Sequence, residues 1–457
     1  MKTFALLFVQ TMLGRLEPSG RRRLRTAATS VAVVCLLGWV RPVFGYSVLT
    51  HEAIVDAEWD KTIVPMLLER FPAATAEQLK EAHAYVYGGC VIQDMGYYPF
   101  GSQFFSHLTH YVRSGDFVEA LFEQSQDIND YAFALGALSH YVADIEGHSI
   151  AVNRAVALLY PRLHREQGDW ITWEESPWAH MLTEFGFDTV EVVAHHNAPQ
   201  AYRDWIGFRV PKPVLDRAFK ETYGLELSKE ILDVDLSIAA YREFANKVVP
   251  EMTEVAWALR SKQLEARASG VHHAELYHLS RESYKDWQQY YRRPGPRDKV
   301  MAFAFRLFPK FGPLSAFDFH APTLQTERLF ADSLRDTVGR YETRLQAVRA
   351  ERYDPPDIDL DTGRPTRPGE YRSCDRTYAK LLHKLKRNHF AGVTPELRDN
   401  LLSFYANPAS DEVNAHAREW HKVSRDLAAF KAVCASHEPQ PALLASNACQ
   451  STSSVGR

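Results

Sequence analysis

The sequence predicts an all-α protein. Four long segments, at 75–89, 127–149, 236–268 and 326–353, repeat apolar residues at the helical period. No run of alternating β-branched residues and no internal repeat interrupts this pattern. The only long break rich in Pro, Gly and Asp lies at 353–371. We therefore expect a multi-helix bundle to which the C-terminal half of the chain adds further helices.

The first two helices carry signals at their ends. Segment 75–89 opens with Thr75, a residue suited to capping, and stops at paired glycines. Segment 127–149 is strongly apolar on one side and offers Asp127 or Asn129 as its cap. Both helices are expected to begin and end at these residues.

The rest of the chain is less sharply bounded. Segments 236–268 and 326–353 have helical period and no turn residue except Pro250. Segment 353–371 is interpreted as a solvated loop or linker, because its acidic residues lack the spacing of a calcium-binding loop. Residues 436–457 show no periodicity and are expected to be disordered.

The N-terminus resembles an export signal. Four arginines within 21–25 precede a short apolar segment at 26–40, and the small residues Val43 and Gly45 suit a signal peptidase. Cleavage there would make Tyr46 the new N-terminus of a secreted or periplasmic protein. An uncleaved membrane anchor is the alternative, although 15 apolar-leaning residues are short for a spanning helix.

Charge and cysteine content restrict the function classes. The net charge is −4, and basic residues are concentrated before position 46, so the remaining chain is more acidic still. An acidic body does not favour non-specific binding to DNA or anionic membranes. Cys90, Cys374, Cys434 and Cys449 would remain after export, and Cys434 with Cys449 is the favoured disulfide among three possible pairings.

The strongest chemical signal is the spacing of His140, Asp144 and His148. Positions i, i+4 and i+8 lie along one stripe of a helix, and Asp144 in the middle has two oxygens that can face different metal ions. A carboxylate within an apolar helix needs a partner, and a cation is the obvious one.

Further candidate ligands lie in the same half of the chain. They are Asp94, His107, His110, His180 and Glu184. His180 and Glu184 are four residues apart and share one helical face. Nitrogen and carboxylate ligands without thiolates suit zinc.

Together these residues resemble the zinc-dependent phospholipase C family. Its members include bacterial phosphatidylcholine-type enzymes and the N-terminal domain of glycosylphosphatidylinositol-specific phospholipase D, and the S1/P1 nucleases are more distantly similar. The resemblance implies an all-α phospholipase C/P1 nuclease-like bundle with three zinc ions. It also implies that the mature N-terminus is a ligand, which matches Tyr46 with His51 five residues later.

The resemblance assigns ligands to three metal positions. The first position takes Asp94, His110, His140 and Asp144, the second takes His148, His180 and Glu184, and the third takes Tyr46, His51 and the other oxygen of Asp144. The sequence departs from the family in two ways. Tyrosine replaces the usual tryptophan at the N-terminus, and only three residues separate Asp144 from His148, so Glu146 and Asn153 are alternatives to His148.

These residues predict a secreted zinc-dependent phosphodiester hydrolase, with phospholipase C-type cleavage preferred. Asp94 is the candidate general base. The predicted organisation is a signal peptide at 1–45, a catalytic domain at 46–225, a helical region at 226–435 that either completes this domain or adds to it, and a tail at 436–457.

The expected substrate is a phospholipid or another phosphodiester, with transient contact at a membrane surface. Aromatic rings at 97–105 would either meet acyl chains there or belong to the core. Two alternatives remain open: a nuclease on the same scaffold, which alone would bind nucleic acid, and a non-catalytic exported protein with structural zinc.

Overall fold

The computed structural model describes residues 48–193, 208–243, 319–406 and 417–437. The described part is almost entirely helical, which confirms the all-α prediction. Its β-structure is one antiparallel pair of two-residue strands, β1 (Ile358–Asp359) and β2 (Arg364–Pro365). No helix within these ranges is long and apolar enough to cross a bilayer.

Short and medium helices make up the N-terminal half. They are α3 (Val48–Glu58), the π-helix η1 (Trp59–Ile63), α4 (Val64–Arg70), α5 (Ala76–Gly89), the 3₁₀-helix η2 (Ile92–Tyr97), α6 (Gln103–Tyr111), α7 (Ser114–Glu123), α8 (Ile128–Glu146), the π-helix η3 (Gly147–Val152), α9 (Asn153–Leu159), α10 (Pro161–Gln167), α11 (Pro177–Val193), α13 (Lys212–Tyr223), α14 (Leu227–Glu230) and α15 (Val234–Glu243). The C-terminal half adds α19 (Leu324–Arg349), α20 (Arg372–Arg387), α21 (Pro395–Phe404) and α23 (Ala417–His437).

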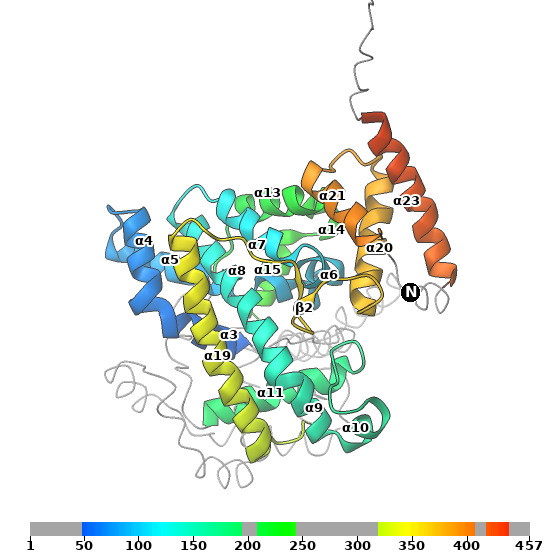
Figure 1. Cartoon of the computed structure of the whole chain (residues 1–457). Helices are drawn as coiled ribbons and strands as arrows, with labels where there is room; N and C mark the ends of the chain where they lie inside the picture. Colours follow the sequence, from blue (N-terminus) through cyan, green and yellow to red (C-terminus); the bar gives the residue numbers. More distant parts are fainter. Residues whose placement is uncertain (1–47, 194–207, 244–318, 407–416, 438–457) are drawn as a thin grey trace, which may run out of the picture.

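Helix α8 lies at the centre of the bundle. Figure 1 shows α5, α7 and α19 around it, and α8 contacts all three. Nearly every side chain of α8 is buried, as expected of a helix that is apolar on most of its circumference. Polar groups on α8 are therefore removed from water and must find partners inside the protein.

The predicted caps are present. The Thr75 side chain accepts a hydrogen bond from the backbone N–H of Gln78, whose side-chain oxygen accepts from the N–H of Thr75. Asp127, and not Asn129, caps α8, because its side chain accepts from the two N–H groups at 129 and 130. These bonds satisfy orphan donors at the first turns of α5 and α8.

Helix α5 ends at the paired glycines as predicted, and the second of them also permits close packing against α8. A Cβ atom at Gly89 would lie 2.0 Å from the carbonyl oxygen of Phe133, and one at Gly136 would lie 2.0 Å from that of Val86. The backbones of α5 and α8 therefore touch, and only residues without a side chain permit this approach. The contact fixes the depth at which α8 sits in the bundle.

The C-terminal helices pack on the same hydrophobic core. Helix α19 covers α8, η3 and α3, while α20 contacts α6 and α23. One buried cluster runs from Val48 in α3 to Phe430 in α23. Helix α19 realises the helix predicted at 326–353, and α15 realises the start of the one predicted at 236–268, whose remainder lies outside the described residues.

Segment 353–371 differs from the expectation of a solvated loop. Asp359, Leu360 and Asp361 are each at most 2 % exposed. The segment forms the β1–β2 pair and lies against α6 and α7. The prediction of a long loop is confirmed, because β1 and β2 are its only regular elements, but the expectation that its acidic residues are solvated was wrong at Asp359 and Asp361. Acidic composition alone does not reveal buried partners, which for Asp361 are tyrosine hydroxyls and a histidine.

Several predictions concern residues that are not described. The signal peptide at 1–45, Tyr46 and the tail from 438 onward lie outside the described ranges, although α23 extends two residues into the predicted tail at 436–457. Cys449 also lies outside them, so its pairing with Cys434 stays a prediction. Cys90 and Cys374 are buried thiols.

Candidate metal centre

Eight of the nine predicted ligand residues lie in the described part, and all eight are at most 2 % exposed. They come from separate elements: His51 from α3, Asp94 from η2, His110 from α6, His140 and Asp144 from α8, His148 from η3, and His180 and Glu184 from α11. Burying this many histidines and carboxylates costs free energy unless they pair with one another or bind cations.

Four ligand atoms converge at the first position. Nε2 of His110 lies 3.4 Å from Oδ1 of Asp94, 3.2 Å from Oδ2 of Asp144 and 3.4 Å from Nε2 of His140. Nε2 of His140 lies 3.2 Å from the same Asp144 oxygen. A tetrahedron of nitrogen and oxygen ligands around zinc has edges of about 3.4 Å, so these separations suit a zinc ion.

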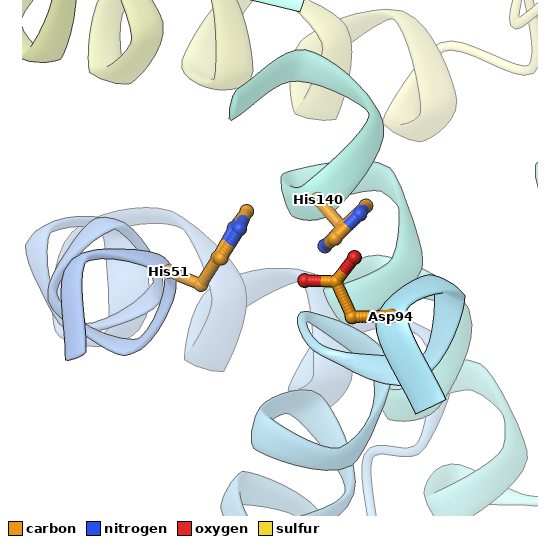
Figure 2. Close-up of side chains that lie close together, drawn as sticks. All are labelled: His51, Asp94 and His140. Carbon is orange, nitrogen blue, oxygen red and sulfur yellow. The ribbon is translucent and has the colours of Figure 1, made fainter. Parts of the chain in front are cut away.

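The second oxygen of Asp144 faces His51. Its Oδ1 lies 3.4 Å from Nε2 of His51, whose ring stacks on His140 with centroids 4.4 Å apart. Figure 2 shows His51, Asp94 and His140 pointing into one space, and one ligand atom from each lies within 4.8 Å of the others. Asp144 thus stands between the first position and His51, which was predicted for the third.

A second group is formed by His148, His180 and Glu184, whose ligand atoms also lie within 4.8 Å of one another. Oε1 of Glu184 is 3.4 Å from Nε2 of His148 and 3.7 Å from Nδ1 of His180. His148 belongs to the π-helix η3, in which the backbone no longer follows the α-helical stripe of His140 and Asp144.

The two alternatives to His148, Glu146 and Asn153, contact residues outside the second group. Glu146 forms an ion pair with Arg340 at 3.0 Å. Asn153 donates a hydrogen bond to the backbone carbonyl of Asp361. Neither residue joins the group of His148, His180 and Glu184.

Backbone carbonyls orient three of the histidines. A carbonyl oxygen only accepts, so the ring nitrogen facing it carries the proton and the opposite nitrogen presents its lone pair. The three contacts are His110 Nδ1 to Ser106 O at 2.7 Å, His140 Nδ1 to Cys90 O at 3.0 Å, and His180 Nε2 to Ile171 O at 2.7 Å. In each case the free nitrogen is the one that faces the other ligands.

Several ligand atoms are buried without a hydrogen bond. They include both oxygens of Asp144, both oxygens of Glu184, Oδ1 of Asp94 and Nδ1 of His180. Buried polar atoms are normally hydrogen-bonded, so this concentration needs an explanation. Divalent cations at the two groups would satisfy these atoms together, and the donor set fits zinc.

Electrostatics differ between neighbouring histidines. Burial and the nearby His140 lower the pKa of His51 to about 3, so its ring is neutral and ready to be a ligand. Burial also lowers the pKa of His110, but the carboxylates of Asp144 and Asp94, 3.2 and 3.4 Å from its Nε2, outweigh this effect and raise the pKa to about 10. Without a cation a proton therefore occupies the space between two carboxylates, and a metal ion would replace it.

Aromatic residues border the centre. The Tyr97 ring lies 5.8 Å from His110 and 6.0 Å from Trp173, and Trp173 lies 6.1 Å from His180. Their rings thus connect the two groups along one side. His107 does not join either group; its ring lies 5.9 Å from Tyr97.

The aromatic stretch at 97–105 is mostly core. Tyr97, Tyr98, Phe104 and Phe105 are buried, whereas Phe100 is 53 % exposed. The core interpretation therefore holds for four of these rings, and Phe100 alone among them faces solvent.

Sequence reasoning missed Asp361. Its Oδ1 lies 3.3 Å from Nδ1 of His148, and its side chain is fully enclosed. Asp357, Asp359 and Asp361 alternate with apolar residues, and this alternation was the available signal that one face of the segment is buried.

Comparison with known proteins agrees with this geometry. Residues 50–232 match the family described as zinc dependent phospholipase C. The matched segment contains the eight predicted ligand residues from His51 to Glu184 and ends before α15. No curated protein and no solved structure matches the chain.

Proposed function

We propose that this chain, whose residues 50–232 belong to the zinc-dependent phospholipase C family, is an exported enzyme that hydrolyses phospholipids by type C cleavage with three zinc ions. The observation that carries the proposal is the ligand spacing at the first position. His110 from α6, His140 and Asp144 from α8 and Asp94 from η2 contribute one atom each, and four of the distances between these atoms are 3.2–3.4 Å, close to the edges expected around zinc. Family membership supports a phospholipid as the substrate.

The chemistry divides between the metal ions and the protein. Zinc at these positions would lower the pKa of a water molecule and neutralise the oxygens of the phosphoryl group. Asp94 is the proton acceptor in this proposal, because its Oδ1 is buried, lacks a hydrogen bond and faces the space between His110 and His51. Backbone carbonyls would keep the free nitrogens of His110 and His140 aimed at the first position, and that of His180 aimed at the second, without reorganisation.

The third metal position requires processing of the chain. His51 and Oδ1 of Asp144 supply two ligand atoms, which leaves room for the α-amino group and carbonyl oxygen of Tyr46. Cleavage after Gly45 would expose that amine. Export to a secreted or periplasmic location is therefore part of the proposed function and not a separate property.

Phe100 supports contact with a lipid surface. It follows η2, the element that carries Asp94, and more than half of its side chain is exposed. A ring in this place would enter the lipid interface and bring η2 close to the headgroup layer. The acidic body of the chain does not favour the alternative nuclease.

The geometry of the second position argues against purely structural zinc. Among the described residues, three candidate ligands come together there: His148, His180 and Glu184. Structural zinc sites are usually closed by four protein ligands, whereas catalytic sites keep an open position.

The test is metal content and product release measured on the same preparation. Protein beginning at Tyr46 should hold about three zinc ions, and should release diacylglycerol and a phosphorylated headgroup from phosphatidylcholine. Phosphatidic acid would indicate type D cleavage, and preferential hydrolysis of single-stranded DNA would indicate the nuclease. A chelator should abolish turnover and lower the melting temperature together, since zinc binds the folded state. One tightly held zinc without turnover would contradict the proposal.

A further inference from the structure

We propose that Asp361 is a positioning residue that holds His148 in the tautomer able to bind zinc, so that the C-terminal half of the chain completes the second metal position. The inference rests on the zinc centre of the proposed function. It concerns a residue outside the segment that matches the family, which ends at residue 232.

His148 differs from the other oriented histidines in its partner. His110, His140 and His180 each direct their second nitrogen at a backbone carbonyl. Nδ1 of His148 lies 3.3 Å from the carboxylate of Asp361, slightly beyond a typical hydrogen bond. Metal-binding histidines commonly face either a carbonyl or a carboxylate in this way, and the carboxylate makes the ring a stronger ligand.

Two tyrosines fix the orientation of Asp361. Oδ2 accepts from the hydroxyl of Tyr111 at 2.8 Å and from that of Tyr371 at 2.5 Å. The Tyr371 oxygen accepts in turn from the backbone N–H of Glu174, so its own proton must point at Asp361. Oδ2 is thus occupied by two donors, and Oδ1 is the oxygen left to face His148.

Backbone hydrogen bonds hold the segment against the centre. The carbonyl of Asp361 accepts from the side-chain amide of Asn153, and the N–H of Leu360 donates to the carbonyl of His110. The segment that carries Asp361 is therefore attached both to the helix after His148 and to the helix that carries a ligand of the first position.

The donor pattern around Asp361 predicts the effect of removing its charge. An ionised carboxylate only accepts, so Nδ1 of His148 must carry a proton, and Nε2, 3.4 Å from Oε1 of Glu184, is the nitrogen left to bind a metal ion. In Asp361→Asn the amide oxygen satisfies the two tyrosines and the amide NH₂ faces His148. Nδ1 then becomes an acceptor, the proton moves to Nε2, and the wrong nitrogen is left to bind the metal.

The experiment measures zinc binding with a competing metallochromic chelator. We expect Asp361→Asn to bind one of three zinc ions about 10–100-fold more weakly, while the other two keep their affinity. The matched control is Asp357→Asn, which removes a half-buried carboxylate of the same segment. Asp357 accepts hydrogen bonds from the N–H groups of Gly115 and Asp116 and not from His148. In this control the affinities for all three zinc ions should therefore equal those of the wild type.

A second measurement separates positioning from loss of structure. Long-range ¹H–¹⁵N NMR of the zinc-loaded protein reports which nitrogen of His148 is protonated and which binds the metal, with His148→Gln identifying the signal. Asp361→Asn should lose the pattern of a protonated Nδ1 and a zinc-bound Nε2, whereas Asp357→Asn should keep it. Unchanged affinity in Asp361→Asn, an equal loss at all three positions, or an unchanged tautomer would each overturn the inference.

These outcomes are independent of lipid hydrolysis. If wild-type protein binds three zinc ions and Asp361→Asn loses one, the inference stands even when no phospholipid is cleaved. If phosphatidylcholine is cleaved and the variant binds zinc like the wild type, the proposed function stands and the inference fails.

Discussion

Oδ1 of Asp144 lies 3.4 Å from Nε2 of His51, while Oδ2 of the same carboxylate lies 3.2 Å from Nε2 of both His110 and His140. One side chain on α8 therefore faces ligands from α3 on one side and from α6 on the other. The pKa of Asp144 is well below its ordinary value, because the neighbouring histidines outweigh the effect of burial. An ionised bridging carboxylate is the role that this arrangement suits.

Asp144→Asn tests that role. An amide offers one neutral oxygen where two anionic oxygens are needed. We therefore expect two of the three zinc ions to bind more weakly. Turnover should fall by more than the roughly 10–100-fold typical of residues that only support a ligand. The control is Asp332→Asn on α19, whose exposed ion pair with Arg335 is worth little. Similar losses in both variants would show that the bridge is misassigned.

The N-terminus provides a second test. An α-amino group titrates near 7.7–8.0, so zinc can displace its proton at neutral pH, whereas an amide nitrogen is a poor ligand. Protein retaining a methionine before Tyr46 should lack one zinc ion and be nearly inactive, and protein released by a protease to begin at Tyr46 should be active. Tyr46→Trp is the control and should be tolerated, because the ligating atoms belong to the backbone. Equal zinc content and turnover in the extended form would refute the processing requirement.

The close contact between α5 and α8 predicts that alanine destabilises the fold at Gly136, while at the exposed Gly339 of α19 alanine should stabilise it. Gly136→Ala should lower the free energy of unfolding by about 1–3 kcal/mol or more, because the new Cβ would lie 2.0 Å from the carbonyl oxygen of Val86. Gly339→Ala, at an exposed helical position with nothing within 4 Å, should raise it by about 0.5–1 kcal/mol. Urea unfolding in the presence of chelator measures both changes apart from metal binding. A stabilised Gly136→Ala would be incompatible with the close helix crossing.

Asp357 predicts a pH dependence of stability. Burial, with the nearby Asp116, raises its pKa from 3.8 to about 7. Between these values the folded state retains a proton that the unfolded chain has released, so this residue lowers stability as pH rises from about 4 to 7. Asp357→Asn cannot ionise and escapes the loss. The melting temperature of the variant minus that of the wild type should therefore increase from pH 5 to pH 8, and a constant difference would contradict the raised pKa.

The sequence by itself determined the helical class, the caps of two helices and the list of candidate ligand residues. Thr75 and Asp127 act on N–H groups within three residues, so their effect depends on local sequence alone. The spacing of His140 and Asp144 likewise places both on one face of any α-helix. Such features are readable because the interacting groups are close neighbours along the chain.

Only the tertiary structure decided which distant groups meet. Gly89 ends α5 as the sequence predicts, but its contact with α8 could not be read from the sequence. Asp361 was placed in a solvated loop although Tyr111, 250 positions earlier, binds its carboxylate. His148 reaches His180 and Glu184 from a π-helix that the regular four-residue spacing does not predict. Contacts of this kind arise from the packing of whole helices, where many weak interactions sum over residues far apart in sequence, and no local pattern records their outcome.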